Sequence, residues 1–293
     1  MHLEGSIDPA TLRELAPEMD AAAVERLYAF DGFPDFLRSF AEVVKRLRDP
    51  ADYALATRRL LARLEEQNVR YAEIILSAGV VLWKKQEFGP VFDAVAAAAA
   101  ESPVQVRWIL DAVRQFGVDH AMQVAQLAAE RLDRGVVAYG IGGDEERGPA
   151  RWFAEVYRFA RSAGLRLTAH AGESAGPGSV WEALEIGAER IGHGIRSVED
   201  PALVQHLRDH AIPLEISITS NLATGVVPAL DRHPLRRLYD AGVPVTLNTD
   251  DPGMFRTTLT REYELAARQF GFGAEEMRGI AANAFRHAFA WVG

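Results

Sequence analysis

Cysteine is absent from the 293 residues of the sequence. Without it no disulfide framework can form, and the redox state of the compartment is left unconstrained. The absence also limits the chemistry of any zinc site. Because thiolate ligands are unavailable, a zinc ion would have to be bound by imidazole and carboxylate groups alone.

Basic charge and long apolar runs are also scarce. The formal net charge is −9, whereas proteins that bind nucleic acids need a basic surface. The alanine-rich run at Val95–Ala100 is far shorter than the about 18 apolar residues of a membrane span. The first residues are acidic and polar where a signal peptide has an apolar core. We therefore expect a cytoplasmic protein with neither nucleic acid nor membrane as a partner, although a metal cation or a neutral small molecule stays compatible with the charge.

Short runs of β-branched and other apolar residues alternate with longer helical patterns. Successive runs start 23 to 34 residues apart, close to the ~30 residues of a strand with its crossover helix. The alternation predicts an α/β fold of the (β/α)8 TIM-barrel type, with residues 1–293 in one domain. Seven strands are predicted, at Tyr71–Ser77, Gln105–Asp111, Gly135–Ile141, Leu165–His170, Arg190–His193, Pro213–Ile218 and Pro244–Asn248. Helices are predicted at Val118–Leu132, Pro149–Ala163, Val180–Gly187, Pro201–His210 and Arg261–Gly271.

The opening of the chain differs from this pattern. Seven strands do not close such a barrel, and Met1-His2-Leu3 is predicted to be the end of a first strand that is truncated at the N-terminus. The stretch from Ser6 to about Asn68 is predicted to form several helices inserted after that strand. Its phenylalanines are expected to pack mainly in the core, although one or two could form an apolar lid over a pocket: Phe30, Phe33, Phe36 and Phe40.

Polar residues gather at the predicted strand ends. His170 and His193 end two successive strands, Asp250-Asp251 follow another, and His2 would end the truncated one. In a barrel of this type, the strand ends at one face bring catalytic groups together whatever their separation in sequence. Each residue alone has an ordinary explanation, such as a satisfied histidine or a turn carboxylate, but the set predicts a functional site. The other histidines are expected to be surface or core residues (His120, His206, His210, His287) or a loop or capping residue (His233).

These residues lie in motifs that together resemble the successive signatures of the adenosine/adenine deaminase family. The motifs are His2-Leu3-Glu4-Gly5-Ser6, Gly142-Gly143-Asp144-Glu145, His170-Ala171-Gly172-Glu173, Gly192-His193-Gly194, Ser220-Asn221 and Asn248-Thr249-Asp250-Asp251-Pro252. The resemblance covers nearly the whole chain. It implies a zinc-dependent hydrolase that converts an adenine nucleoside to the inosine-type product and ammonia. The deaminases that bind zinc through cysteine are excluded, because the sequence has none.

The resemblance also implies roles for the matching residues. One Zn²⁺ per chain would be bound by His2, His170 and Asp250. Glu173 would protonate the purine ring nitrogen beside the amine-bearing carbon, and His193 would orient and deprotonate the attacking water. This chemistry needs a dry pocket that raises the pKa of Glu173, because the acid has to be protonated when substrate is bound.

Substrate contacts are implied at three further positions. Asp251 would hydrogen-bond the imidazole-ring nitrogen of the purine, the Gly143 backbone would contact the far pyrimidine nitrogen, and Glu4 would lie at the sugar end. Two-metal relatives bridge their metals with a modified lysine at the end of the fourth barrel strand. None of the three lysines of this chain, Lys45, Lys84 and Lys85, lies there, so a single zinc is predicted.

Some positions depart from the family pattern. The first histidine of the His-x-His motif is missing, because Met1 occupies the position between the two, and the loss of an imidazole ligand is expected to weaken zinc binding. Glu4 stands where adenosine-specific members usually carry aspartate. Gly140 and Ile75 replace polar residues, and Ser217 replaces a common cysteine.

Three functions stay open. The stretch Ser77–Lys85 and the loop Gly140–Glu145 resemble bacterial deaminases of 6-aminodeoxyfutalosine, an adenine nucleoside with a carboxyphenyl-bearing extension at the ribose. Lys84 and Lys85 could attract that carboxylate, or could be a solvated pair at a helix end. The alternatives are deamination of free adenine, which Glu4 permits, and a purine- or metal-binding barrel without catalysis. The presence of both Glu173 and His193 argues against the last, because mere binding needs no proton-transfer pair.

Overall fold

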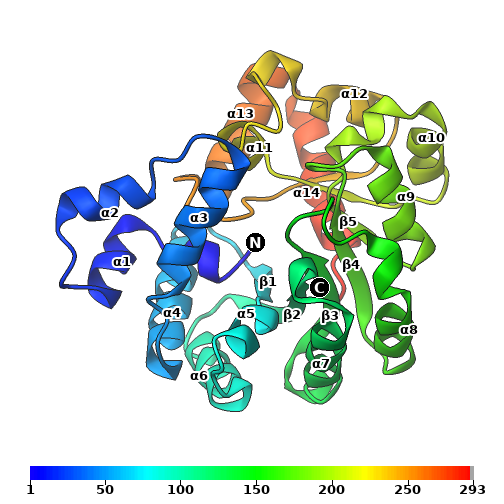
Figure 1. Cartoon of the computed structure of the whole chain (residues 1–293). Helices are drawn as coiled ribbons and strands as arrows, with labels where there is room; N and C mark the ends of the chain where they lie inside the picture. The colour runs from blue at the N-terminus through cyan, green and yellow to red at the C-terminus, as the bar shows by residue number, and fades with distance from the viewer. Residues whose placement is uncertain (291–293) are drawn as a thin grey trace.

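The computed structural model describes residues 1–290. Seven parallel strands form one curled sheet in the order of the chain, which is the architecture of a TIM-type barrel (Figure 1). Each begins within one residue of its predicted start. The strands are β1 (Tyr71–Leu76), β2 (Gln105–Val113), β3 (Val136–Gly142), β4 (Arg166–Ala171), β5 (Arg190–His193), β6 (Leu214–Ile216) and β7 (Val245–Leu247).

Residues 1–3 occupy the gap between the first and last strands. His2 forms an isolated parallel bridge with Ile75, and its backbone N–H donates to the carbonyl of Asp250 at 2.9 Å. On the other side, the Leu3 N–H donates to the Ile75 carbonyl at 2.8 Å. The described residues therefore form seven strands, and Met1-His2-Leu3, predicted to be the end of a truncated further strand, forms a single bridge.

Four helices separate this bridge from β1: α1 (Pro9–Leu15), α2 (Ala21–Leu27), α3 (Gly32–Val44) and α4 (Pro50–Glu66). Asp8, Asp20 and Asp49 cap α1, α2 and α4 by accepting from a backbone N–H of the first turn, as N-cap aspartates do. In Figure 1, α3 crosses beside the N-terminus. It contacts the turn that carries Glu4.

The remaining helices pack around the sheet (Figure 1). None of those within residues 1–290 is long and apolar enough to cross a membrane. They are α5 (Ala78–Trp83), α6 (Phe88–Ala100), α7 (Val118–Ala129), α8 (Ala154–Ser162), α9 (Pro177–Glu185), α10 (Pro201–Asp209), α11 (Ile218–Ala223), α12 (Leu235–Asp240), α13 (Leu259–Phe270) and α14 (Ala274–Arg286).

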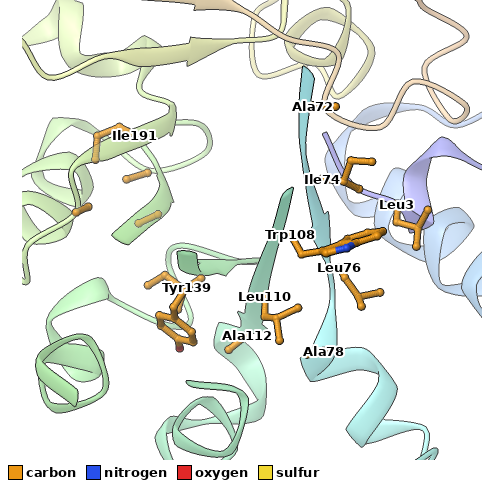
Figure 2. Close-up of a cluster of buried hydrophobic side chains, with 14 of the residues drawn as sticks. Leu3, Ala72, Ile74, Leu76, Ala78, Trp108, Leu110, Ala112, Tyr139 and Ile191 are labelled. Carbon is orange, nitrogen blue, oxygen red and sulfur yellow. The ribbon is translucent and has the colours of Figure 1, made fainter. Parts of the chain in front are cut away.

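Side chains alternate between two buried layers along the strands, as the period of two requires. Ile74 and Leu76 of β1 belong to the main hydrophobic core together with Trp108, and Figure 2 shows these three side chains near Leu3. The intervening Ile75 belongs to a separate small cluster. The layer that contains Ile74 and Leu76 thus packs the sheet against its helices. The layer that contains Ile75 leaves the strand ends free to carry polar groups.

The two ends of the sheet are chemically different. At the beginning of β5, the buried Arg190 pairs with Glu73 at 2.6 Å and with Glu215 at 2.8 Å. Its guanidinium also lies 3.9 Å from the centre of the Phe289 ring. This end holds a buried ion network, and the three residues of that network line a cavity of about 160 Å³ together with His2, His170, His193 and Asp250. The histidines and aspartates singled out in the sequence lie at the opposite end, where the strands terminate.

Candidate active site

The three predicted metal ligands converge at the end of the sheet where the strands terminate. The Nε2 atoms of His2 and His170 are 3.1 Å apart, and His2 Nε2 lies 3.6 Å from Asp250 Oδ1. Each residue offers one ligand atom, and these atoms lie within 4.8 Å of one another. His170 is on β4, Asp250 follows β7 and His2 precedes the first turn, so the curvature of the sheet brings together residues 168 and 248 positions apart.

The donor atoms suit a zinc ion. Burial lowers the pKa of His2 to about 3 and also lowers that of His170, so both imidazoles are neutral. His170 Nδ1 lies 3.2 Å from the Ile141 carbonyl, which can only accept, so the ring proton sits on Nδ1 and Nε2 keeps its lone pair. Ser220 donates to Asp250 Oδ2 at 2.7 Å and leaves Oδ1 facing the imidazoles.

Glu173 and His193 form a second group of possible ligands, which shares Asp250 with the group of His2 and His170. His193 Nε2 lies 3.7 Å from Glu173 Oε2 and 3.9 Å from Asp250 Oδ2. His193 and Asp250 both have positive φ angles, 63° and 56°, a backbone conformation that is uncommon outside glycine and that often accompanies functional residues. Burial is the main cause that raises the pKa of Glu173 well above its usual value, and the charges of Asp250 and Glu145 add to it. A carboxyl in this state can serve as a proton donor near neutral pH.

One cavity of about 300 Å³ contains both groups. Of the eight predicted site residues, seven line it, and Glu4 is the exception. The Glu4 side chain is fully buried, accepts from the Ser77 N–H at 2.9 Å and has no partner at Oε2. Burial raises its pKa to about 8. Ser77, rather than Glu4, faces the cavity.

The two other predicted substrate contacts depend on glycine. Gly143 has a φ of +93°, a backbone conformation that a residue with a side chain adopts only with strain. A Cβ on Gly5 would lie 1.6 Å from Asp251 Oδ1. The Asp251 carboxyl is buried, and burial together with the charge of Asp250 raises its pKa well above the usual value. In its protonated form it can donate to a ring nitrogen.

Several residues of the site were not predicted. Asp111 lines the cavity, has no partner at Oδ1, and has a pKa raised to about 6 by burial. Asn221 Nδ2 lies 3.1 Å from His193 Nδ1, and Asn221 Oδ1 lies 3.1 Å from His233 Nε2. His233 was expected to be a loop or capping residue; it does accept the Leu235 N–H, but it also supports the site. Only the Ser220-Asn221 motif hinted at this chain of contacts.

The two lysines proposed to attract a carboxylate do not face the cavity. Lys84 donates to the carbonyl of Val44, the last residue of α3, at 2.9 Å, and to that of Leu47 in the following turn. Lys85 is exposed. Neither lines the cavity, so the alternative interpretation of a pair at a helix end fits the structure.

Glu145 anchors the loop that carries Glu173. Its buried carboxylate accepts from the backbone N–H groups of Gly172, Glu173 and Ser174 at 2.7, 2.9 and 3.0 Å, and from the Ser179 hydroxyl. Burial raises the pKa of Glu145, but these bonds and the positive charge of Arg114 outweigh it and lower the pKa, so the residue is ionised. The Glu173 backbone is thus held in place by a fixed charge.

Replacing Glu145 by Gln should destabilise the protein by about 1–3 kcal/mol, because an amide NH₂ would face backbone donors that it cannot satisfy. Loss of the charge should also lower the pKa of Glu173. Thermal unfolding of E145Q measures the first effect, with E146Q as the matched control because Glu146 is exposed. Equal melting temperatures for the two variants would contradict the anchoring role.

Comparison with known proteins agrees with this geometry. A profile described as adenosine deaminase matches residues 1–291. The chain belongs to the adenosine deaminase family. Its relatives are hydrolases that act on C–N bonds of adenine-type substrates.

Two curated relatives from different branches are equally similar. The aminodeoxyfutalosine deaminase of Streptomyces avermitilis is 37% identical over 99% of this chain and 85% of its own length. The adenine deaminase of Rhizobium johnstonii is also 37% identical, over 98% and 92%. A crystal structure of an amidohydrolase from Burkholderia ambifaria with bound zinc matches with a TM-score of 0.90 and 25% identity, over 99% of this chain and 84% of that one.

Proposed function

We propose that this protein is a zinc-dependent deaminase of an adenine nucleoside, with adenosine or 6-aminodeoxyfutalosine as substrate. The observation that carries the proposal is the adjacency of two groups in one cavity. His2, His170 and Asp250 present neutral imidazole and carboxylate donors, and Glu173 and His193 lie beside them. A binding protein would need the first group but not a buried, protonated acid next to it.

The zinc ion would be held by His2, His170 and Asp250. When bound it supplies a Lewis acid that lowers the pKa of a water molecule towards neutrality. The charge of the site suits one ion, because the three ligands carry a single negative charge among them. The tautomer of His170 is set by its bond to the Ile141 carbonyl, so the ligand is oriented before the metal binds.

The remaining residues would bind and protonate the purine. Glu173 holds a proton because its burial raises its pKa, and would give that proton to the ring nitrogen beside the amine-bearing carbon. Asp251 would donate to the imidazole-ring nitrogen, and the backbone of Gly143 would contact the far pyrimidine nitrogen. The aromatic side chains of α3 close the cavity over these groups, where Phe33, Phe36 and Phe40 line it. Exclusion of water there strengthens every polar contact below.

One wall of the cavity is apolar and favours a nucleoside with an apolar extension. This wall, which we call the upper wall, is formed by the phenylalanines of α3 together with Val80 and Phe116. Phe116 stacks on Trp83 with centroids 5.7 Å apart and an angle of 6° between the rings, and Trp83 is 59% exposed. An aromatic surface thus continues from the cavity wall to the exterior. Ribose hydroxyls gain little from such a wall, whereas an aryl group on the sugar would be buried against it.

Free adenine is the second candidate substrate. It is favoured by the adenine deaminase relative, which matches as closely as the aminodeoxyfutalosine enzyme. Glu173, Asp251 and Gly143 would bind the purine ring of either substrate, so the upper wall decides between the two substrates. An enzyme of free adenine would leave the Trp83–Phe116 surface without a role.

A zinc-supplemented assay tests the function directly. Loss of the adenine absorbance and release of ammonia would be followed with adenosine, adenine and 6-aminodeoxyfutalosine. We expect turnover of the extended nucleoside with the highest kcat/KM. A higher kcat/KM for adenosine would reject the extended substrate, a preference for adenine would move the protein to the second candidate, and no turnover of any of them by the zinc-loaded protein would reject deamination.

The role of the aromatic surface can be measured with two matched nucleosides, 5′-deoxy-5′-(phenylthio)adenosine and 5′-deoxy-5′-(methylthio)adenosine. We expect the phenyl compound to bind about tenfold more tightly, as stacking on an aromatic surface would provide. W83A should reduce that ratio towards one. W152A is the control, because Trp152 is similarly exposed, at 54%, but does not stack on Phe116 as Trp83 does. Equal affinities for the two compounds would contradict this assignment.

A further inference from the structure

Three buried side chains form a hydrogen-bonded chain behind the cavity. It begins at a backbone N–H, that of Leu235, which lies 3.2 Å from His233 Nδ1. It continues from His233 Nε2 to Asn221 Oδ1 and from Asn221 Nδ2 to His193 Nδ1, both at 3.1 Å. His193, Asn221 and His233 are 3%, 0% and 4% exposed, so water does not compete for these bonds.

The direction of every bond follows from the first. A backbone N–H can only donate, so His233 Nδ1 must be the acceptor and carries no proton. His233 is neutral, with a pKa lowered to about 4 mainly by burial, and its one proton is therefore on Nε2. That proton is donated to the oxygen of Asn221, which fixes the orientation of the amide. The Asn221 NH₂ group then donates to His193 Nδ1, which must be unprotonated.

We propose that this chain holds His193 as the tautomer with its proton on Nε2, which makes His193 a hydrogen-bond donor to the cavity rather than a base. The proposal rests on the proposed function, in which His193 faces the attacking water. Asn221 and His233 are then positioning residues, which act on the reaction through the imidazole of His193.

The geometry on the cavity side fits a donor. His193 Nε2 is 3.7 Å from Glu173 Oε2 and 3.9 Å from Asp250 Oδ2, so it makes no direct hydrogen bond to either carboxylate. An oxygen atom of water can accept from Nε2 between them and would be oriented by that bond. This differs from the expectation that His193 removes a proton from the water, since a ring nitrogen that already carries a proton cannot accept another.

The proton of the water must then pass to a different group, and Glu173 is placed to take it. Glu173 would first give its proton to the purine ring nitrogen and become a carboxylate. The carboxylate would then accept a proton from the water as the oxygen forms its bond to the carbon. One proton leaves Glu173 and one returns, so the enzyme ends this step in the protonation state in which it began.

Nuclear magnetic resonance of protein labelled with ¹⁵N-histidine reads the tautomer directly. We expect the resonances of His193, assigned by their loss in H193Q, to show a protonated Nε2 and an unprotonated Nδ1, both with zinc added and with chelator. The opposite tautomer in the wild-type protein would overturn the proposal. This spectrum needs no catalytic turnover, so its outcome is independent of whether the protein deaminates any of the assayed substrates.

Replacing Asn221 by Asp should invert the tautomer. The carboxylate accepts where the NH₂ group donated, so the His193 proton should move to Nδ1, while the bond from His233 is kept. We expect the inverted ¹⁵N pattern and a decrease in kcat of roughly tenfold to a hundredfold, the usual effect of losing a residue that orients a site histidine. N68D is the control, because Asn68 is exposed. An unchanged His193 spectrum in folded N221D would reject the chain as the cause, and should N221D not fold, the wild-type spectrum decides by itself.

Discussion

Replacing Glu173 by Gln should lower kcat for the preferred adenine nucleoside roughly a thousandfold, in the range that general acid catalysis contributes. Hydroxide attack on the purine disrupts an aromatic ring, and protonation of the adjacent ring nitrogen offsets that cost. Glutamine can hydrogen-bond the nitrogen but cannot release a proton to it. KM should change much less than kcat, because the amide preserves the contact with bound substrate.

Steady-state kinetics of E173Q beside wild type measure this effect. E185Q is a suitable control, because Glu185 is exposed on α9 and should retain wild-type activity. A reduction below about tenfold would mean that another group supplies the proton, since a general acid is worth at least ~100-fold.

The same residue sets the pH dependence. Glu173 must be protonated, so kcat/KM should fall as pH rises through the pKa of Glu173. Burial, with the charges of Asp250 and Glu145, places that pKa well above the usual range of carboxyl groups, so the falling limb should lie far above pH 4.5. In E145Q one of the neighbouring charges is removed, and the limb should move to lower pH. A shift in the opposite direction would contradict the electrostatic account.

The strands and the placement of the candidate metal ligands were predictable because they depend on patterns of short range. β-branched runs separated by about 30 residues specify parallel strands, and the ends of such strands meet at one face. His170, His193 and Asp250 could therefore be placed together without any knowledge of their contacts. Their roles came from the resemblance of the surrounding motifs to a known family.

The contacts of the supporting residues were not predictable for a physical reason, although Glu145 and Asn221 lie in motifs that resemble the family. Glu145, Asn221 and His233 act through hydrogen bonds to groups 12 to 34 residues away in sequence. Nothing in their local sequence distinguishes a buried acceptor from a solvated one. Lys84 shows the reverse case: beside a predicted pocket its charge suggested a substrate contact, but the fold directs it to the carbonyl that ends α3.

Replacing His170 by Ala should remove zinc and activity together. The change deletes a neutral imidazole whose Nε2 lies 3.1 Å from that of His2, leaving His2 and Asp250 as the only members of this ligand group. Two ligands do not retain zinc against dilution, because affinity depends on a full ligand set. We expect the zinc content to drop from about one ion per chain to roughly a tenth of that or less, and deamination to fall below detection.

Elemental analysis after dialysis measures the metal, and the assay with added zinc measures the activity. H210A is the matched control, because His210 is exposed and contacts His206 of the preceding helical turn through its carbonyl and its ring. Zinc should also stabilise wild type against heat but not H170A, since a ligand that binds only the folded state raises the free energy of unfolding. If H170A retained one zinc per chain, the ion would be bound elsewhere, and the adjacency of metal and acid from which the deaminase function is inferred would have to be abandoned.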